Sequence, residues 1–239
     1  MNSEKSSAPQ EGRRAAIDII LVLGTLFIVK YTLLSIESMW TYAGPISLIL
    51  SVIVASWRLK THGETWAALG LSRPQSWPKI VGWSVIALVL TMLVGLFSEG
   101  VVNASIANAS QAASDNSGRF ANLPGNIGEY FYWLAVAWLI GGFIEEMIFR
   151  SFLITRFERL FAKLPFRLAF AIIIPAIVFG QQHHYYQGIS GAIATGSVAL
   201  VSGVLYILFK RSLWPLTISH GLANSIGLTM IFLGIQPAG

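Results

Sequence analysis

The stretch WLIGGFIEEMIFRSFLITRF, residues 138–157, is apolar enough to lie in a lipid bilayer, yet it holds two adjacent glutamates and a nearby arginine. Each charge near the centre of a membrane helix costs roughly 2.5 to 3.5 kcal/mol on an insertion scale, so such residues are rare and suggest function. The stretch therefore predicts a membrane helix that carries chemically useful groups, namely Glu145, Glu146 and Arg150.

The composition of the whole chain is that of a polytopic membrane protein. Of its 239 residues, 54% are hydrophobic and 11% are charged, against about 25% charged in an ordinary soluble domain. Cysteine is absent, which excludes disulfides, a thiolate zinc site and a cysteine nucleophile. The net charge of +5 does not indicate nucleic acid, because the placement of positive charges matters more in a membrane protein. We expect the lipid bilayer as a partner and no nucleic acid.

Apolar windows near the 20 residues that cross a bilayer predict an all-α membrane helix bundle of about seven transmembrane helices. An eighth span or a re-entrant segment near residues 185–191 is an alternative. The seven windows are 17–36, 45–57 with its flanks, 80–97, 130–154, 168–182, 193–209 and 213–233.

The same windows divide the chain into two regions. Residues 1–128 form an N-terminal region of three spans that ends in a polar outer loop, and residues 129–239 form a C-terminal core that includes the stretch 138–157. With the N-terminus in the cytoplasm, 14 of the 16 Lys and Arg fall on the cytoplasmic side, as the positive-inside rule requires. The exceptions are Lys30, which we expect to snorkel outward from the first span, and Arg119 in the outer loop.

The charges of the opening stretch differ in their helical neighbours. Glu146 and Arg150 are four residues apart, so they share one helix face and can neutralise each other. Glu145 points about 100° away from Glu146 on an α-helix, and it needs a different partner. Candidates from later spans are His183 and the pair His220 and Asn224, which are also four residues apart.

Depth in the membrane tests whether these groups meet. At about 1.5 Å per residue, Glu145 and His220 lie roughly 16 and 14 Å from the nearest cytoplasmic arginine. His183 lies roughly 24 Å from the nearest cytoplasmic arginine, Arg167. That histidine is too deep unless its helix bends, and Pro175 offers a place for a bend.

Two kinds of chemistry fit such a cluster. A carboxylate and an imidazole that share a water can act as general base and acid, and an imidazole with a carboxamide can stabilise an oxyanion. These are the parts for hydrolysing an amide. Alternatively, Glu145, His183 and His220 form a two-histidine, one-carboxylate zinc set. The residues by themselves leave both open.

Three motifs in this region resemble those of a known family. EEMIFR matches EExxxR, FGQQH matches FxxxH and HGLAN matches HxxxN, the motifs of the CAAX protease and bacteriocin-processing (CPBP, or ABI) family of intramembrane proteases. Each motif is weak alone, but the ordered set within membrane spans is specific. The resemblance implies an intramembrane endopeptidase that acts on membrane-associated peptides or proteins, lipidated ones included.

The resemblance also implies a role for each motif residue. Glu145 would activate the water, assisted by His183. His220 and Asn224 would form the oxyanion hole. The supporting residues would be Glu146 and Arg150. This mechanism needs no metal, and zinc held by Glu145, His183 and His220 is the alternative.

Other interpretations compete with this one. GISG, residues 188–191, matches the GxSG of rhomboid serine proteases, with Ser190 as nucleophile and His220 as base, but that mechanism leaves Glu145 and His183 unexplained. A non-catalytic binding, immunity or regulatory protein of the same architecture is a second class. The chain is short and shows no sorting signal, so we expect a prokaryotic inner or plasma membrane protein with a site that opens towards the cytoplasm.

Overall fold

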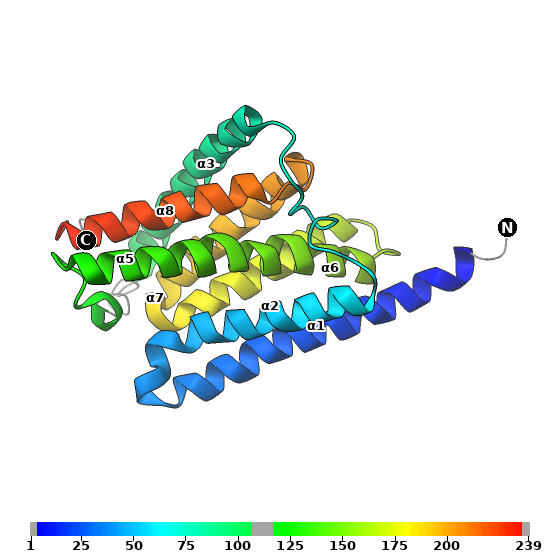
Figure 1. Ribbon diagram of the computed structural model, residues 1–239, viewed down its shortest axis with the longest axis horizontal. Coiled ribbons are helices and arrows are strands. Elements are labelled where there is room, and N and C mark those ends of the chain that lie inside the picture. Colours follow the sequence, from blue (N-terminus) through cyan, green and yellow to red (C-terminus); the bar gives the residue numbers. More distant parts are fainter. Residues whose placement is uncertain (1–3, 107–116, 236–239) are drawn as a thin grey trace.

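The computed structural model describes residues 4–106 and 117–235, and within these ranges the chain is helical and has no strand. Figure 1 shows the long helices gathered side by side in one bundle. The predicted all-α fold class is thereby confirmed. Residues 107–116, in the middle of the predicted outer loop, lie outside the described residues.

The N-terminal part contributes three long helices and one short one. Helix α1 (Glu4–Leu34) leads through the 3-10 helix η1 (Glu37–Tyr42) into α2 (Ala43–Thr61), and α1 and α2 lie along each other (Figure 1). Helix α3 (Trp77–Ser105) has Pro78 in its first turn, where the missing N–H of proline costs no helical hydrogen bond. It packs on the C-terminal helices α7 and α8, so the two halves of the chain share one bundle.

The opening stretch lies in a continuous helical run, Ile127–Leu160, whose centre is not α-helical. The run consists of α5 (Ile127–Val136), the π-helical segments η3 (Ala137–Glu145) and η4 (Met147–Leu153), and α6 (Ile154–Leu160). A short 3-10 helix, η2 (Ser117–Phe120), precedes it. Because π-helical turns are rare and often occur at functional sites, the geometry itself marks the segment with the two glutamates.

Helix α7 (Arg167–Leu208) is a hairpin of two helical arms. Gly188 interrupts it with φ 64° and ψ −166°, a conformation that favours glycine. The arms pack so closely that a Cβ on Gly180 would clash with the carbonyl oxygen of Ala192. The chain therefore reverses at Gly188, whereas Pro175, where we expected a bend, lies inside the first arm.

Five helices in the described part of the chain are long and apolar enough to cross a membrane, judged by length and composition. Helix α7 counts once among the five although it has two arms. Helix α8 (Trp214–Phe232) is 19 residues long but is not among them, because polar side chains such as His220 and Asn224 lower its mean hydropathy. The count of seven to eight spans stays a prediction.

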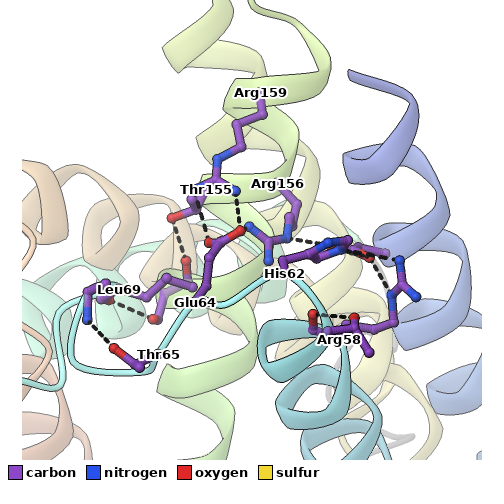
Figure 2. Close-up of polar contacts among 12 residues, drawn as sticks. Arg58, His62, Glu64, Thr65, Leu69, Thr155, Arg156 and Arg159 are labelled. Carbon is purple, nitrogen blue, oxygen red and sulfur yellow. Dashed lines mark hydrogen bonds and ion pairs between the residues drawn. The ribbon is translucent and has the colours of Figure 1, made fainter. Parts of the chain in front are cut away.

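One end of the bundle is held by paired charges, which we call the ionic cluster (Figure 2). Asp18 on α1 pairs with Arg58 on α2 at 2.6 Å and with Arg156 on α6 at 2.8 Å. Glu64, in the connection after α2, pairs with Arg156 at 3.0 Å and with Arg159 at 2.7 Å. The members of the cluster are Asp18, Arg58, His62, Glu64, Arg156 and Arg159. The cluster ties α1 and α2 to the helical run that carries the glutamates.

Candidate active site

Residues from both the N-terminal and the C-terminal helices line one cavity of about 520 Å³. It contains all six side chains that the motifs singled out, and each comes from a π-helical segment, the junction beside it, α7 or α8. These six are Glu145, Glu146, Arg150, His183, His220 and Asn224. The structure thus brings the predicted residues together, and their individual roles stay predictions.

Glu146 is the most constrained carboxylate of the cavity. Its side chain is 1% exposed, and its Oε1 lies 3.2 Å from Nη1 of Arg150, as the spacing of four residues predicted. The same oxygen accepts a hydrogen bond from Nδ1 of His220 at 2.8 Å. This second contact fixes the ring of His220 and places its Nε2 on the other side. Glu146 therefore orients a histidine on another helix, a contact for which the sequence offered no signal.

Glu145 is held much more loosely than Glu146. Its side chain is 14% exposed, and its Oε2 lies 3.9 Å from Nε2 of His220, beyond hydrogen-bond distance. Among the described residues, Glu145 has no Arg or Lys within 4.0 Å. Because Arg150 is occupied by Glu146, the carboxylate of Glu145 remains open to the cavity.

His183 reaches the cavity from the first arm of α7. Its Nδ1 lies 2.8 Å from the carbonyl oxygen of Phe179, so Nδ1 donates and Nε2 is left as an acceptor. In the described part of the chain, His183 makes no ion pair with Glu145 within 4.0 Å. The two side chains line the same cavity without an ion pair between them.

Phe179 organises the aromatic side of the cavity. Its ring lies 4.5 Å from the His183 ring and 6.3 Å from the His220 ring, centroid to centroid. The guanidinium of Arg150 lies over the same ring at 4.5 Å, a cation–π distance. Sequence reasoning missed this role, although the first letter of the FxxxH motif pointed to the residue. One side chain therefore sets the positions of two histidines and an arginine.

Asn224 sits where the helices approach most closely. Its Nδ2 lies 3.4 Å from the carbonyl oxygen of Ala137, a long hydrogen bond. A Cβ on Gly141 would lie only 2.6 Å from the same Nδ2, so glycine is needed to leave room for the carboxamide. Gly141 belongs to the site for this steric reason, which the sequence motif alone did not reveal.

Lys30 contradicts our expectation that its side chain snorkels outward. It is 1% exposed and lines the cavity. Its Nζ donates to the carbonyl oxygen of Gln182 at 2.6 Å and to the Oε1 of Gln182 at 2.9 Å. A buried ammonium is stable only with such partners, so the side chain turns towards α7 rather than towards lipid. The missed signal was Gln182, directly before the motif histidine.

The competing chemistries can also be compared with the geometry. Ser190, the nucleophile of the rhomboid interpretation, donates its hydroxyl hydrogen bond to Oδ1 of Asn103 at 2.9 Å, not to His220. Within the described residues, no group of three or more His, Asp or Glu side chains is arranged to hold a metal ion. The zinc set of Glu145, His183 and His220 stays a prediction.

The family comparison agrees with the motifs. Residues 127–226 match the model of the Rce1-like family, described as type II CAAX prenyl endopeptidase Rce1-like. Residues 127–226 belong to the CAAX protease family. This CAAX protease region begins at the first residue of α5 and ends within α8, so it holds all six motif residues and both arms of α7. Comparison with curated proteins and with solved structures finds no match.

Proposed function

We propose that this protein is a membrane-embedded endopeptidase that hydrolyses peptide bonds of membrane-associated substrates, lipidated ones included. The observation that carries the proposal is the carboxylate of Glu145, which faces a cavity and has no Arg or Lys partner among the described residues. A charge left unpaired in a membrane helix is costly and indicates function. The CAAX protease family region around it gives the reaction class.

In the proposed reaction, Glu145 acts as the general base. Its carboxylate takes a proton from a water in the cavity, and the oxygen of that water attacks the carbonyl carbon of the substrate. The Nε2 of His183, an acceptor while Nδ1 donates to Phe179, holds the second hydrogen of the water. The protonated Glu145 then gives its proton to the leaving amine, which returns Glu145 to its carboxylate form.

His220 and Asn224 would stabilise the oxyanion that forms when the water attacks. The Nδ2 group of Asn224 has a hydrogen to spare beside its long contact with Ala137. The Nδ1 of His220 donates to Glu146, so Nε2 can donate only if the ring carries both protons, and the Glu146 carboxylate provides the countercharge. Removing one oxyanion donor costs roughly 100- to 1,000-fold in turnover in other enzymes.

The cavity and the charges suggest where the substrate lies. A volume of about 520 Å³ falls in the usual range of ligand sites, roughly 300 to 1,000 Å³.

Seven membrane passes would follow from the five candidate helices if α7 crosses twice and α8 crosses once. In this topology the N-terminus is cytoplasmic, the site opens towards the cytoplasm and the membrane is a prokaryotic inner or plasma membrane, in keeping with the distribution of Lys and Arg.

The experiment compares wild type with Glu145→Gln in proteoliposomes that contain membrane-associated peptides. We expect cleavage to fall by roughly 100- to 10,000-fold, the usual contribution of a general base, with an unchanged melting temperature because Glu145 holds no ion pair with Arg or Lys. Undiminished cleavage by Glu145→Gln would refute the assignment.

The same preparation tests the metal-free mechanism. Elemental analysis and activity are measured before and after treatment with a chelator. We expect activity to persist without stoichiometric metal. Zinc present at one equivalent and lost in step with activity would defeat the metal-free mechanism in favour of a zinc-dependent one.

A further inference from the structure

Lys30 lies in α1, far in sequence from the family region, yet it contacts the core of the site. Its ammonium group is buried, and the nearest partners are the two oxygen atoms of Gln182, at 2.6 and 2.9 Å. It also lies over the ring of Tyr185 at 4.3 Å. All three residues line the cavity. An apolar side chain would fill the same space at lower cost, so packing alone does not explain a buried lysine here.

The partner of Lys30 is the residue directly before His183. Gln182 is itself buried, and its amide donates to Oε1 of Gln181 at 2.9 Å. Gln181 in turn donates to the hydroxyl of Tyr31, the neighbour of Lys30, at 2.6 Å. Two consecutive residues of α1 thus hold the two consecutive residues that precede the histidine.

Gln181 and Gln182, the residues that α1 contacts, lie near the break in α7 at Gly188. The first arm of α7 ends at the reversal at Gly188, about one and a half turns after His183. Backbone groups in the last turn before a break lack helical partners, so the arm needs support from another helix. Within its own helix, the ring of His183 contacts Phe179, through the hydrogen bond from Nδ1 and the neighbouring ring, and Tyr186. The contacts of Lys30 and Tyr31 with Gln182 and Gln181 add support to this arm from α1.

We propose that Lys30 is a positioning residue, which fixes His183 in the cavity by holding Gln182 at its backbone and side-chain oxygens. The proposal rests on the proposed function for its effect on turnover. It assigns the N-terminal helix a part in the site, although no motif lies in that helix.

The first test measures turnover in Lys30→Met, which keeps the length of the side chain and removes the charge. We expect kcat to fall by roughly 10- to 100-fold, the size of effect that a small misplacement produces, while KM stays unchanged. In a His183→Ala background the same substitution should cause no additional loss. Lys30→Arg should restore part of the turnover. Equal, additive losses in both backgrounds would overturn the proposal, because a purely structural residue acts independently of His183.

The second test does not depend on activity. Diethylpyrocarbonate labels unprotonated imidazoles, and mass spectrometry follows the labelling of His183 in a His184→Gln background, which removes the neighbouring histidine. We expect Lys30→Met to raise the labelling rate of His183 several-fold and to leave that of His220 unchanged. Unchanged labelling of His183 sinks the proposal even if wild type cleaves no peptide, whereas absent cleavage alone sinks only the proposed function.

Two further variants keep the tests decisive. Leu26→Ala removes an equally buried side chain one turn earlier on α1, so it should lower the melting temperature but change neither kcat nor the labelling of His183. Gln182→Met removes the side-chain acceptor of Lys30 and the donor to Gln181 but keeps the backbone acceptor of Lys30, and it should reproduce the effects of Lys30→Met at smaller size. Its result decides the matter if Lys30→Met does not fold.

Discussion

The ionic cluster and the cavity are both built from buried charges, but they use them differently. In the ionic cluster, Asp18 contacts two arginines and, at 3.2 Å, His62, and Glu64 contacts two arginines. In the cavity, Glu146 has Arg150 and His220, and one of its oxygens has no hydrogen-bond partner in the structure. Glu145 has only a distant histidine.

Under the proposed function, the difference separates charges that stabilise the fold from a carboxylate that reacts. In a paired cluster, the ion pairs offset the hydration free energy that the charged groups lost on burial, and they hold the helices in place. A carboxylate without such a pair retains the capacity to bind a water or a proton. Real proteins break the rules of polar pairing mainly at functional sites. The contrast between Asp18 and Glu145 therefore predicts opposite responses to mutation.

The largest effect on stability is expected from Asp18→Asn. The substitution leaves the arginines of α2 and α6 around a buried neutral amide, and breaking a buried pair costs about 3 to 5 kcal/mol. The melting temperature in detergent should fall well below that of Glu145→Gln, while the remaining folded protein cleaves normally. As a control, Glu158→Gln removes a half-exposed pair with Arg211 and should cost less than about 1 kcal/mol. Equal melting temperatures for Asp18→Asn and this control would end the distinction between the two regions.

Glu146→Gln tests a residue that both forms an ion pair and lies in the cavity. The amide keeps an acceptor for His220 but leaves Arg150 without its countercharge. We expect a loss of about 1.5 to 3 kcal/mol in stability, the worth of a hydrogen bond to a charged group, together with a loss of turnover. Thermal melting and cleavage are measured on the same sample. Loss of turnover with intact stability would move Glu146 from a supporting to a directly catalytic role.

The smallest expected effect is the dependence of stability on acidic pH. Burial raises the pKa of Glu64, but hydrogen bonds from Arg159 and Arg156 outweigh burial and hold it below the ordinary value of 4.5. A carboxyl group with a lowered pKa stabilises the fold above the pKa of the unfolded chain and loses this contribution as pH falls through the folded pKa. Wild type should therefore melt above Glu64→Gln at pH 7, and the difference should shrink below about pH 4.5. A difference that is constant between pH 7 and pH 3.5 contradicts the ion-pair explanation.

Much of the site could be predicted from the sequence because it depends on spacing within single helices. The pair of Glu146 and Arg150 follows from four residues of separation, and the structure contains it. The isolation of Glu145 from that arginine follows from the same geometry, even though the segment is π-helical rather than α-helical. The family region was predictable because its motifs combine residue types that are rare inside membranes.

Contacts between helices could not be predicted in the same way. The hydrogen bond from His220 to Glu146, the central ring of Phe179 and the space that Gly141 leaves for Asn224 all depend on how distant segments pack. The inward turn of Lys30 depends on the hairpin that places Gln182 beside α1.

The sequence by itself determined the fold class, the membrane character and the family region, because composition, apolar length and spacing along one helix are properties of the chain. It also marked Glu145 as the carboxylate without a local partner. Only the tertiary structure decided which side chains surround that carboxylate and that α1 supports the histidine arm. The physical reason is that partners from different helices are chosen by packing, and a buried charge takes whichever polar group the packing brings within reach.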